Sequence, residues 1–364
     1  MKIIQVHSLF SLPVHVPNRG ADGLAKRAVF GGVERQRISY QAQQYALRKS
    51  PEMAALEAAG GIGHSYRTAL VGERLLRPAL EEAKVAEAAG WTDALMALWR
   101  KEQTGERAAE ADESSAPLIV GEQEIRLFVA VAQTCAEAGM APDGLRALVE
   151  KKAPKETPPA VVQAIEALRT ARGSVGFDGA LFGRMATGIA VATVDRAVRF
   201  GDALTTHAIT PVVDFFLVTD DLKDRAAGEA GGSHINTREE AAGIFYRHVL
   251  IDTAQLQSNG VDPAAVIAPL LAALLTVSPI GNRSPARVVE TLVEVGGQVR
   301  SLMDAYAAPV SPQDQAVTRL RETAAADAET YGRPAAALWL SEQSAQPVSR
   351  VQSLAAAALA EWVK

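Results

Sequence analysis

Apolar residues recur with two different periods along the chain, and the change of period divides it. A strand pattern rich in β-branched and aromatic residues occurs at residues 2–10, 177–186, 244–251 and 288–295. Between residues 51 and 172, apolar residues instead recur at the spacing of amphipathic helices, in segments rich in Ala, Leu and Glu. The pattern therefore predicts an α+β protein in which a block of helices interrupts the strands.

The predicted helices form two groups. Inside the interrupting block, helical spacing and helix-start or helix-stop residues predict helices at 51–59, 75–89, 91–102, 121–138, 142–151 and 159–172. Outside it, the same signals predict helices at 40–49, 263–277, 301–307, 312–331 and 349–363, with a helix-like amphipathic stretch at 193–209. Strands and helices therefore interleave outside the block.

Two insertions into a strand-containing core explain this order. The first is the helical block at 55–172, and the second is 210–240, which has no sustained period and is expected to be a projecting loop or hairpin. The remaining residues, 1–54, 173–209 and 241–364, read strand, helix, strand, helix-like stretch, strand, helix and strand. This order is compatible with the split βαβ, ferredoxin-like plan that many RNA-binding domains use.

A basic window in an acidic chain is the clearest functional signal. Residues 19–49 hold seven Lys or Arg residues against two acids, a charge of +5, whereas the whole chain carries −5. Ser39 is expected to cap a helix whose first N–H groups add an anion site, with Gln41, Gln44 and Arg48 on one face. A local positive patch on an acidic protein indicates a polyanion held at one place.

The sequence lacks the common catalytic, nucleotide-binding and zinc signatures, and its six histidines are scattered without ligand spacing. We therefore expect no cofactor and no bound metal. The single Cys135 cannot form an intramolecular disulfide, the N-terminus does not resemble a signal peptide, and no apolar run is long enough for a membrane helix. A cytoplasmic location is expected.

Four features have both a structural and a functional interpretation. Asp22 either pairs with Arg19 or caps a turn, which is favoured, or assists metal-dependent or general-base RNA cleavage. Two acids at 220–221 are usually solvated, although they could bind a hard cation. Phe215 and its neighbour at 216 form either a small satellite core or a wedge against bases, whereas Met185 fits the pattern of a core residue.

Three motifs occur together in a fixed order. They are FGG-x-x-R-x-R-I-S-x-Q at 30–41, GRMAT at 183–187, and HAIT at 207–210 followed by D-F-F-x-x-x-D-D-L at 214–222. This set resembles the CasC family, the repeated RNA-binding backbone subunit of the type I-E CRISPR Cascade complex. FYR at 245–247 and AQLQ at 254–257 extend the resemblance.

The resemblance implies a modified RNA-recognition (RRM, ferredoxin-like) palm with a large helical fingers insertion and a projecting thumb loop. Copies are expected to stack head to tail along the spacer of a CRISPR RNA, each thumb displacing one base at regular intervals, so that target DNA pairs in segments. The expected partners are this guide RNA, the target DNA strand, neighbouring copies, and the large, small, end-capping and RNA-processing Cascade subunits. No cleavage is assigned to this subunit in the family.

The residues expected to bind RNA come from all three parts of the chain. The resemblance implies contacts by Arg19, Lys26, Ser39, Gln41, Arg48, Met185, Phe215 and Phe216, and Arg27, Arg37, Gln44, Lys49 and Arg283 complete the predicted set. Gln44 and Tyr45 stand where relatives can carry basic residues, which weakens those two contacts. Two rival hypotheses remain open, an RNA endonuclease that uses Asp22 and a helical scaffold that binds no nucleic acid.

Overall fold

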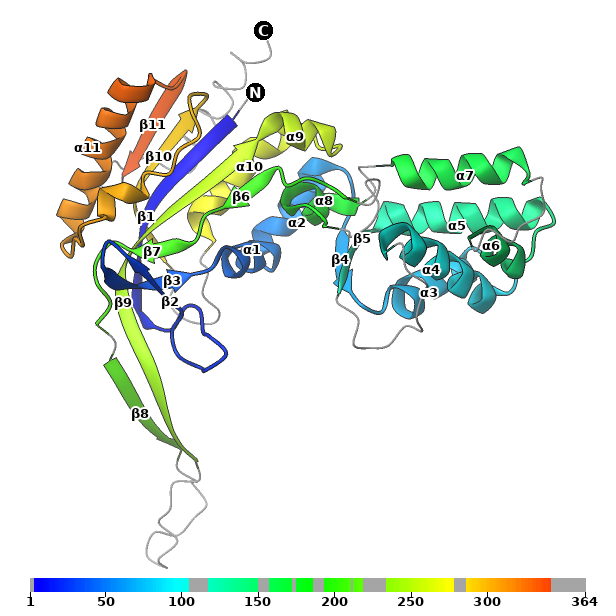
Figure 1. The fold of residues 1–364 in the computed structure, drawn as a ribbon, viewed down its shortest axis with the longest axis horizontal. Helices are drawn as coiled ribbons and strands as arrows, with labels where there is room; N and C mark the ends of the chain where they lie inside the picture. The colour runs from blue at the N-terminus through cyan, green and yellow to red at the C-terminus, as the bar shows by residue number, and fades with distance from the viewer. Residues whose placement is uncertain are drawn as a thin grey trace, which may run out of the picture. The chain divides into compact units, whose positions relative to one another are not determined.

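The structure is a computed structural model that describes residues 3–104, 117–149, 157–171, 175–185, 193–210, 212–218, 234–277 and 286–341. The chain folds as two compact units (Figure 1). The first comprises Met1–Met53, Arg199–Ile251 and Ala268–Lys364, and the second comprises Ala54–Val198 and Asp252–Ile267. Among the described residues, no helix combines the length and the hydropathy that a membrane span requires.

The first unit is built on an antiparallel sheet with the strand order β11-β10-β1-β9-β7-β3-β2, in which β6 and β8 also pair with β9 (Figure 1). Its strands are β1 (Ile3–His15), β2 (Arg27–Phe30), β3 (Val33–Ile38), β6 (Val198–Phe200), β7 (Ala203–Thr205), β8 (Val212–Val218), β9 (His234–Asp252), β10 (Arg287–Val295) and β11 (Ala336–Ser341). The strands predicted at 2–10, 244–251 and 288–295 are confirmed as parts of β1, β9 and β10.

Both faces of this sheet are covered. Successive residues of a strand point to opposite sides, and successive residues of β1 pack in different apolar clusters. Leu9 packs with Tyr246 and Tyr306 in one apolar cluster, whereas the next residue along β1, Phe10, packs with Phe245 in another. The helices of this unit are α1 (Tyr40–Arg48), the start of α2 (Pro51–Gly60), most of α10 (Pro263–Thr276), the 3₁₀ turn Met303–Tyr306 and α11 (Gln313–Tyr331). β1 is therefore buried along most of its length, including its polar residues Gln5, His7 and Ser8.

The longest strand, β9, serves two purposes. Near its C-terminal end, Phe245 and Tyr246 pair with β7 inside the sheet. Nearer its N-terminus, residues 234–240 pair with β8 in a two-stranded arm, with Val212 opposite Glu240 and Val218 opposite His234. At about 3.4 Å per residue, the seven residues of β8 make this arm about 24 Å long. The second predicted insertion is thus a hairpin arm, and the acids at 220–221 lie outside the described residues.

The second unit is mainly helical. It contains the π-helical turn Gly72–Leu76, α3 (Arg77–Glu82), α4 (Ala88–Thr104), α5 (Glu122–Glu137), α6 (Pro142–Val149), α7 (Pro159–Thr170), α8 (Gly176–Phe182) and α9 (Thr253–Ser258), with a hairpin of β4 (Ser65–Thr68) and β5 (Leu118–Gly121). Trp99 and Phe128 stack at 5.2 Å inside its core, which also buries Cys135. The unit extends past the predicted insertion at 55–172, since it also includes residues 173–198 and 252–267.

Two predicted element types are wrong. The strand expected at 177–186 is the helix α8, and the helix-like stretch at 193–209 contains the strands β6 and β7. Every residue of α8 is buried, including Asp178, so the helix has no exposed polar face to reveal a helical period. In β6, exposed Arg199 lies between two buried residues, a strand alternation too short to outweigh the surrounding Ala-rich composition. The helix predicted at 349–363 lies outside the described residues.

Candidate functional site

The basic window begins with a tight hairpin between β2 and β3. Gly31 and Gly32 form its turn with φ of +60° and +78°, a conformation that favours glycine at both positions. The two glycines differ in their surroundings. A Cβ on Gly31 would overlap the carbonyl oxygen of Ala307, whereas no other atom approaches the corresponding position of Gly32. The Gly pair therefore lets this hairpin pack closely against the backbone that follows the 3₁₀ turn.

The helix α1 begins as predicted, with Ser39 as its N-cap. The Ser39 hydroxyl accepts a hydrogen bond from the Ala42 N–H at 3.4 Å, while the Ser39 N–H donates to Asn18 Oδ1 at 3.1 Å. The N–H of Tyr40 donates to Asp202 Oδ1 at 2.8 Å. That the helix start also binds an anion stays a prediction, because protein groups already occupy the N–H donors of Tyr40 and Ala42 and one of these groups is a carboxylate. Ser39 is buried and orients the helix.

Arg27, Arg35 and Arg37 of the window are bound to protein groups. Arg35 is fully buried and donates to the carbonyl oxygens of Phe30, Thr205 and Tyr306 at 3.2, 3.2 and 2.8 Å. Burial lowers the pKa of this arginine, which acts as a fixed donor inside the fold. It therefore contributes no charge to the surface.

Arg27 and Arg37 form ion pairs at the edge of the same region. Arg37 contacts Asp202 at 2.7 Å, and Arg27 lies between Glu34 at 3.0 Å and Glu239 at 2.5 Å. Burial acts to lower the pKa of Arg27, but the hydrogen bonds and charges of the two glutamates outweigh it and raise the pKa. That Arg27 and Arg37 also contact a polyanion stays a prediction, because carboxylates compensate both charges.

The other four cations of the window lie at its surface and form, with two amides, what we call the grip surface. Its members are Arg19, Lys26, Gln41, Gln44, Arg48 and Lys49, of which Arg19, Gln41 and Lys49 are exposed and the others half-buried. The loop that carries the first two is closed by backbone hydrogen bonds, from the Lys26 N–H to the Asn18 carbonyl at 2.9 Å and from the Arg37 N–H to the Lys26 carbonyl at 2.8 Å. The loop is therefore fixed to the hairpin that leads into α1.

Asp22 caps a turn, which is a structural role that the sequence favoured. Its side chain is exposed, and its Oδ1 accepts a hydrogen bond from the Leu24 N–H at 3.0 Å, which closes a turn within the loop. Within the described ranges, no group of three or more His, Cys, Asp or Glu side chains lies close enough together to hold a metal ion.

Two apolar candidates are exposed. Met185 is 85% exposed, which contradicts its interpretation as a core residue, although Arg184 beside it is buried and contacts Glu124 at 2.7 Å. Phe215 on the β8 arm is 58% exposed, so it belongs to no satellite core among the described residues. The backbone of Phe216 pairs with Asn236, its side chain is not described, and Arg283 lies outside the described residues.

The sequence analysis missed the carboxylates that complete the site. Asp202 and Glu239 lie far along the chain from the arginines that they pair with, and Glu239 is 212 residues from Arg27. No local spacing signal connects residues so far apart. Tyr45, 60% exposed on α1, is a further surface aromatic beside the grip surface.

Comparisons with known proteins agree with the motifs. The sequence profile described as "CT1975-like protein" matches residues 4–364. A solved chain titled "CRISPR RNA-guided surveillance complex, pre-nicking" superposes with a TM-score of 0.72 at 21% identity, covering 98% of this chain and 100% of that chain. Another, titled "CRISPR RNA-guided surveillance complex", gives 0.65 at 21% identity, with 98% and 99% covered. Among curated proteins, none matches the sequence. At this identity the structural matches establish a shared fold.

Proposed function

Because the chain belongs to the CT1975-like family and its resemblance to CasC backbone subunits is confirmed, we propose that it is an RNA-binding backbone subunit of a CRISPR surveillance complex. The observation that carries the proposal is the grip surface. It places four cations and two amides around one helix of an otherwise acidic protein. Such a surface suits a single polyanionic strand bound at a defined place.

The chemistry of the grip surface favours contacts to phosphates and sugars over contacts to base edges. A guide carries an arbitrary spacer sequence, so its holder must bind the backbone and leave the bases free for pairing. Lys and Arg neutralise phosphates, and amides such as Gln41 donate hydrogen bonds without a sequence requirement. Gln44 and Tyr45 add hydrogen-bonding and apolar contact but no charge, so affinity rests on Arg19, Lys26, Arg48 and Lys49.

The exposed apolar residues complete the proposal. Phe215 on the arm and Met185 after α8 are large and solvent-accessible, as a wedge against bases must be. In this proposal the arm of one copy displaces a guide base at the neighbouring copy, and head-to-tail contacts, which need not close, generate a filament along the spacer. The remaining partners are the target DNA strand and the other subunits of a type I-E Cascade complex.

The proposed subunit is not an enzyme. Asp22 closes a turn with its own loop backbone, which supports a structural role for this carboxylate. The rival endonuclease hypothesis makes a different prediction, namely periodic cuts in complementary RNA when the assembled complex is incubated with Mg²⁺. Cuts that disappear in an Asp22→Ala variant would establish that rival and remove the non-catalytic assignment.

Salt dependence tests the grip surface directly. If the four surface cations each neutralise one phosphate of single-stranded RNA, the log–log slope of the association constant against salt is roughly −2.8 per subunit. A double variant, Lys26→Glu with Arg48→Glu, should lose guide RNA while its circular dichroism and melting temperature stay close to wild type. A salt-insensitive complex, or full RNA retention by the double variant, contradicts the proposal.

A further inference from the structure

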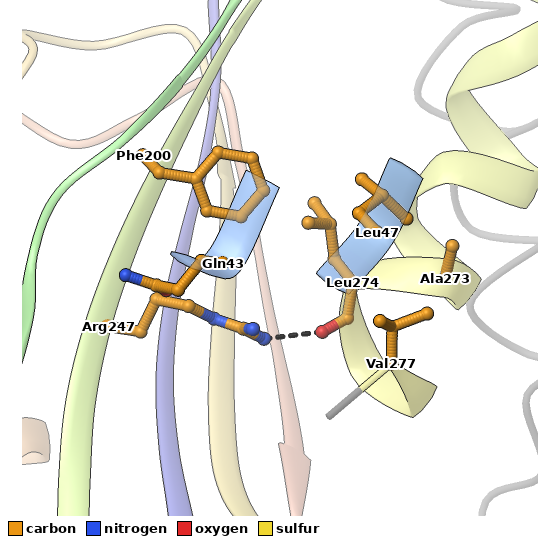
Figure 2. A pocket seen from close by; sticks show the side chains of 7 residues that line it. All are labelled: Gln43, Leu47, Phe200, Arg247, Ala273, Leu274 and Val277. Atoms are coloured by element: carbon orange, nitrogen blue, oxygen red, sulfur yellow. Dashed lines mark hydrogen bonds between the residues drawn. The ribbon is translucent and has the colours of Figure 1, made fainter. Parts of the chain in front are cut away.

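Arg247, in the FYR motif, is a buried cation that no role above explains. It lies on β9, is 5% exposed, and donates from Nη2 to the carbonyl oxygen of Leu274 (Figure 2). Leu274 is two residues before the end of α10, where carbonyl groups lack helical partners and the helix dipole favours a positive charge. The guanidinium also lies 5.3 Å from the centre of the Phe10 ring. Arg247 therefore joins β9 to the end of α10.

Gln43 approaches the same place from α1. It is 3% exposed, and its Nε2 donates to the carbonyl oxygens of Ile38 at 3.2 Å and Gly201 at 2.9 Å. Two carbonyl partners require the NH₂ group on their side, which fixes the orientation of the amide. The Oε1 atom must then point away from both carbonyls.

One acceptor and one donor are left over in this arrangement. Gln43 Oε1 and Arg247 Nε are both buried, and neither has a hydrogen-bond partner among the described residues. Both side chains line one pocket, whose other walls are largely apolar (Figure 2). These walls are Leu47, Phe200, Ala273, Leu274 and Val277. Buried polar atoms are nearly always paired, either with protein or with ordered water, so this pair requires a ligand.

We propose that this pocket holds one water molecule, which accepts a hydrogen bond from Arg247 Nε–H and donates one to Gln43 Oε1. The pocket volume of about 10 Å³ is enough for one water and for little else. The polarity also selects water, because the site offers one donor and one acceptor. An anion would satisfy the guanidinium but meet the lone pairs of Gln43, and a cation would meet the charge of Arg247.

The water would connect α1, through Gln43, with β9, through Arg247. The bond from Arg247 to Leu274 extends this connection to α10. Gln43 lies between Gln41 and Gln44 on α1, so fixing its buried amide sets the rotation at which the helix presents both residues at the surface. This inference rests on the two unpartnered atoms and the pocket, and it does not depend on RNA binding.

A crystal structure of the full chain at about 1.5 Å resolution tests the proposal, because ordered water is visible there. We expect one isolated density peak within hydrogen-bond distance of both Gln43 Oε1 and Arg247 Nε. An empty site, or a protein atom in its place, overturns the proposal. A second crystal grown in bromide separates water from an anion, since an anomalous peak at the site would identify a halide and would also overturn it.

A pair of variants tests the site in solution. Ala273→Val adds two methyl groups to the wall of the pocket, and Ala316→Val makes the same change at an equally buried residue of α11, which does not line it. If the pocket holds the water, Ala273→Val displaces it, leaves both polar atoms unpaired and lowers the melting temperature by several degrees more than the control does. An equal or smaller decrease than in Ala316→Val means that the pocket is an apolar gap, and the proposal fails.

Discussion

Replacing Arg27 by methionine distinguishes two roles that a basic residue of the window 19–49 can have, namely a structural ion pair and a contact to RNA. Methionine keeps an unbranched apolar side chain but removes the guanidinium that contacts Glu34 and Glu239. The Glu239 side chain is only 4% exposed, the Arg27 side chain is 31% exposed and that of Glu34 is 56% exposed. The substitution therefore leaves the Glu239 carboxylate buried without its cation. The Glu34 carboxylate is already in solvent.

The expected loss follows from these exposures. Removing one partner of a buried ion pair destabilises a protein by about 3–5 kcal/mol, and the partial exposure of Arg27 places this pair at the lower end, about 3 kcal/mol. The exposed pair with Glu34 contributes about 0–1 kcal/mol. Arg27→Met should thus lower the free energy of unfolding of the first unit by about 3 kcal/mol, whereas Glu34→Gln should change it by less than about 1 kcal/mol.

Thermal unfolding followed by calorimetry measures the stability change, and RNA binding across a salt series measures the contact. Replacing both partners, as Arg27→Met with Glu239→Leu, should recover most of the lost stability, because apolar pairs substitute well for buried ion pairs. The salt slope of Arg27→Met should match wild type, while that of Lys26→Met should be smaller in magnitude by about 0.7. Wild-type stability combined with a reduced salt slope would refute the structural role of Arg27 and assign it to RNA.

Three further outcomes are expected. Gly31→Ala should destabilise the protein by about 3 kcal/mol or more in thermal unfolding, because a Cβ there meets a carbonyl oxygen at a positive φ; Gly32→Ala, where no atom lies nearby, should lose only about 1 kcal/mol, and equal losses would contradict this account. Burial and a neighbouring histidine lower the pKa of His248 from 6.5 to about 3, so the unfolded chain binds a proton that the folded chain does not. Stability should therefore fall as pH drops below about 6.5, by up to about 1.4 kcal/mol per pH unit, and His248→Phe should flatten this dependence in melts at pH 7 and 4.5. Phe215→Ala should leave the melting temperature unchanged, because the side chain is exposed, but should reduce the fluorescence of 2-aminopurine at displaced guide positions; unchanged fluorescence would exclude the wedge.

The sequence predicted the fold best where an element has one clear period. β1, β9 and β10 are long strands, and α5 has a polar face opposite buried Ile125 and Phe128, so their types were evident. α8 was mistaken for a strand because all seven of its residues are buried, including its one charged residue, Asp178, so no exposed polar face marks a helical period. The short strands β2, β4, β5 and β11 have four to six residues each, too few for a reliable alternation.

The local geometry of the basic window was predicted, but the partners of its charges were not. The glycine pair, the Ser39 cap and the sequence density of Lys and Arg identified the window from local signals alone. Which cations remain at the surface depends instead on tertiary partners, and these come from distant segments. Arg35 reaches the carbonyl of Tyr306, which is 271 residues away, and Arg27 reaches Glu239. A charge count along the sequence therefore overestimates the cationic surface available to RNA.

The ion pair of Arg27 also explains how the grip surface and the β8 arm keep a fixed position relative to each other. Glu239 pairs with Val213 at the base of the β8 arm, and it is also the buried partner of Arg27, the residue after Lys26. One ion pair thus fixes the base of the arm to the strand β2, which directly follows Lys26, a residue proposed to bind phosphate. If the arm displaces guide bases at a regular interval, its distance from the phosphate contacts must be constant, and a rigid connection inside one unit provides this. Weakening the Arg27–Glu239 pair should therefore make the spacing of the displaced bases irregular before it reduces the affinity for RNA.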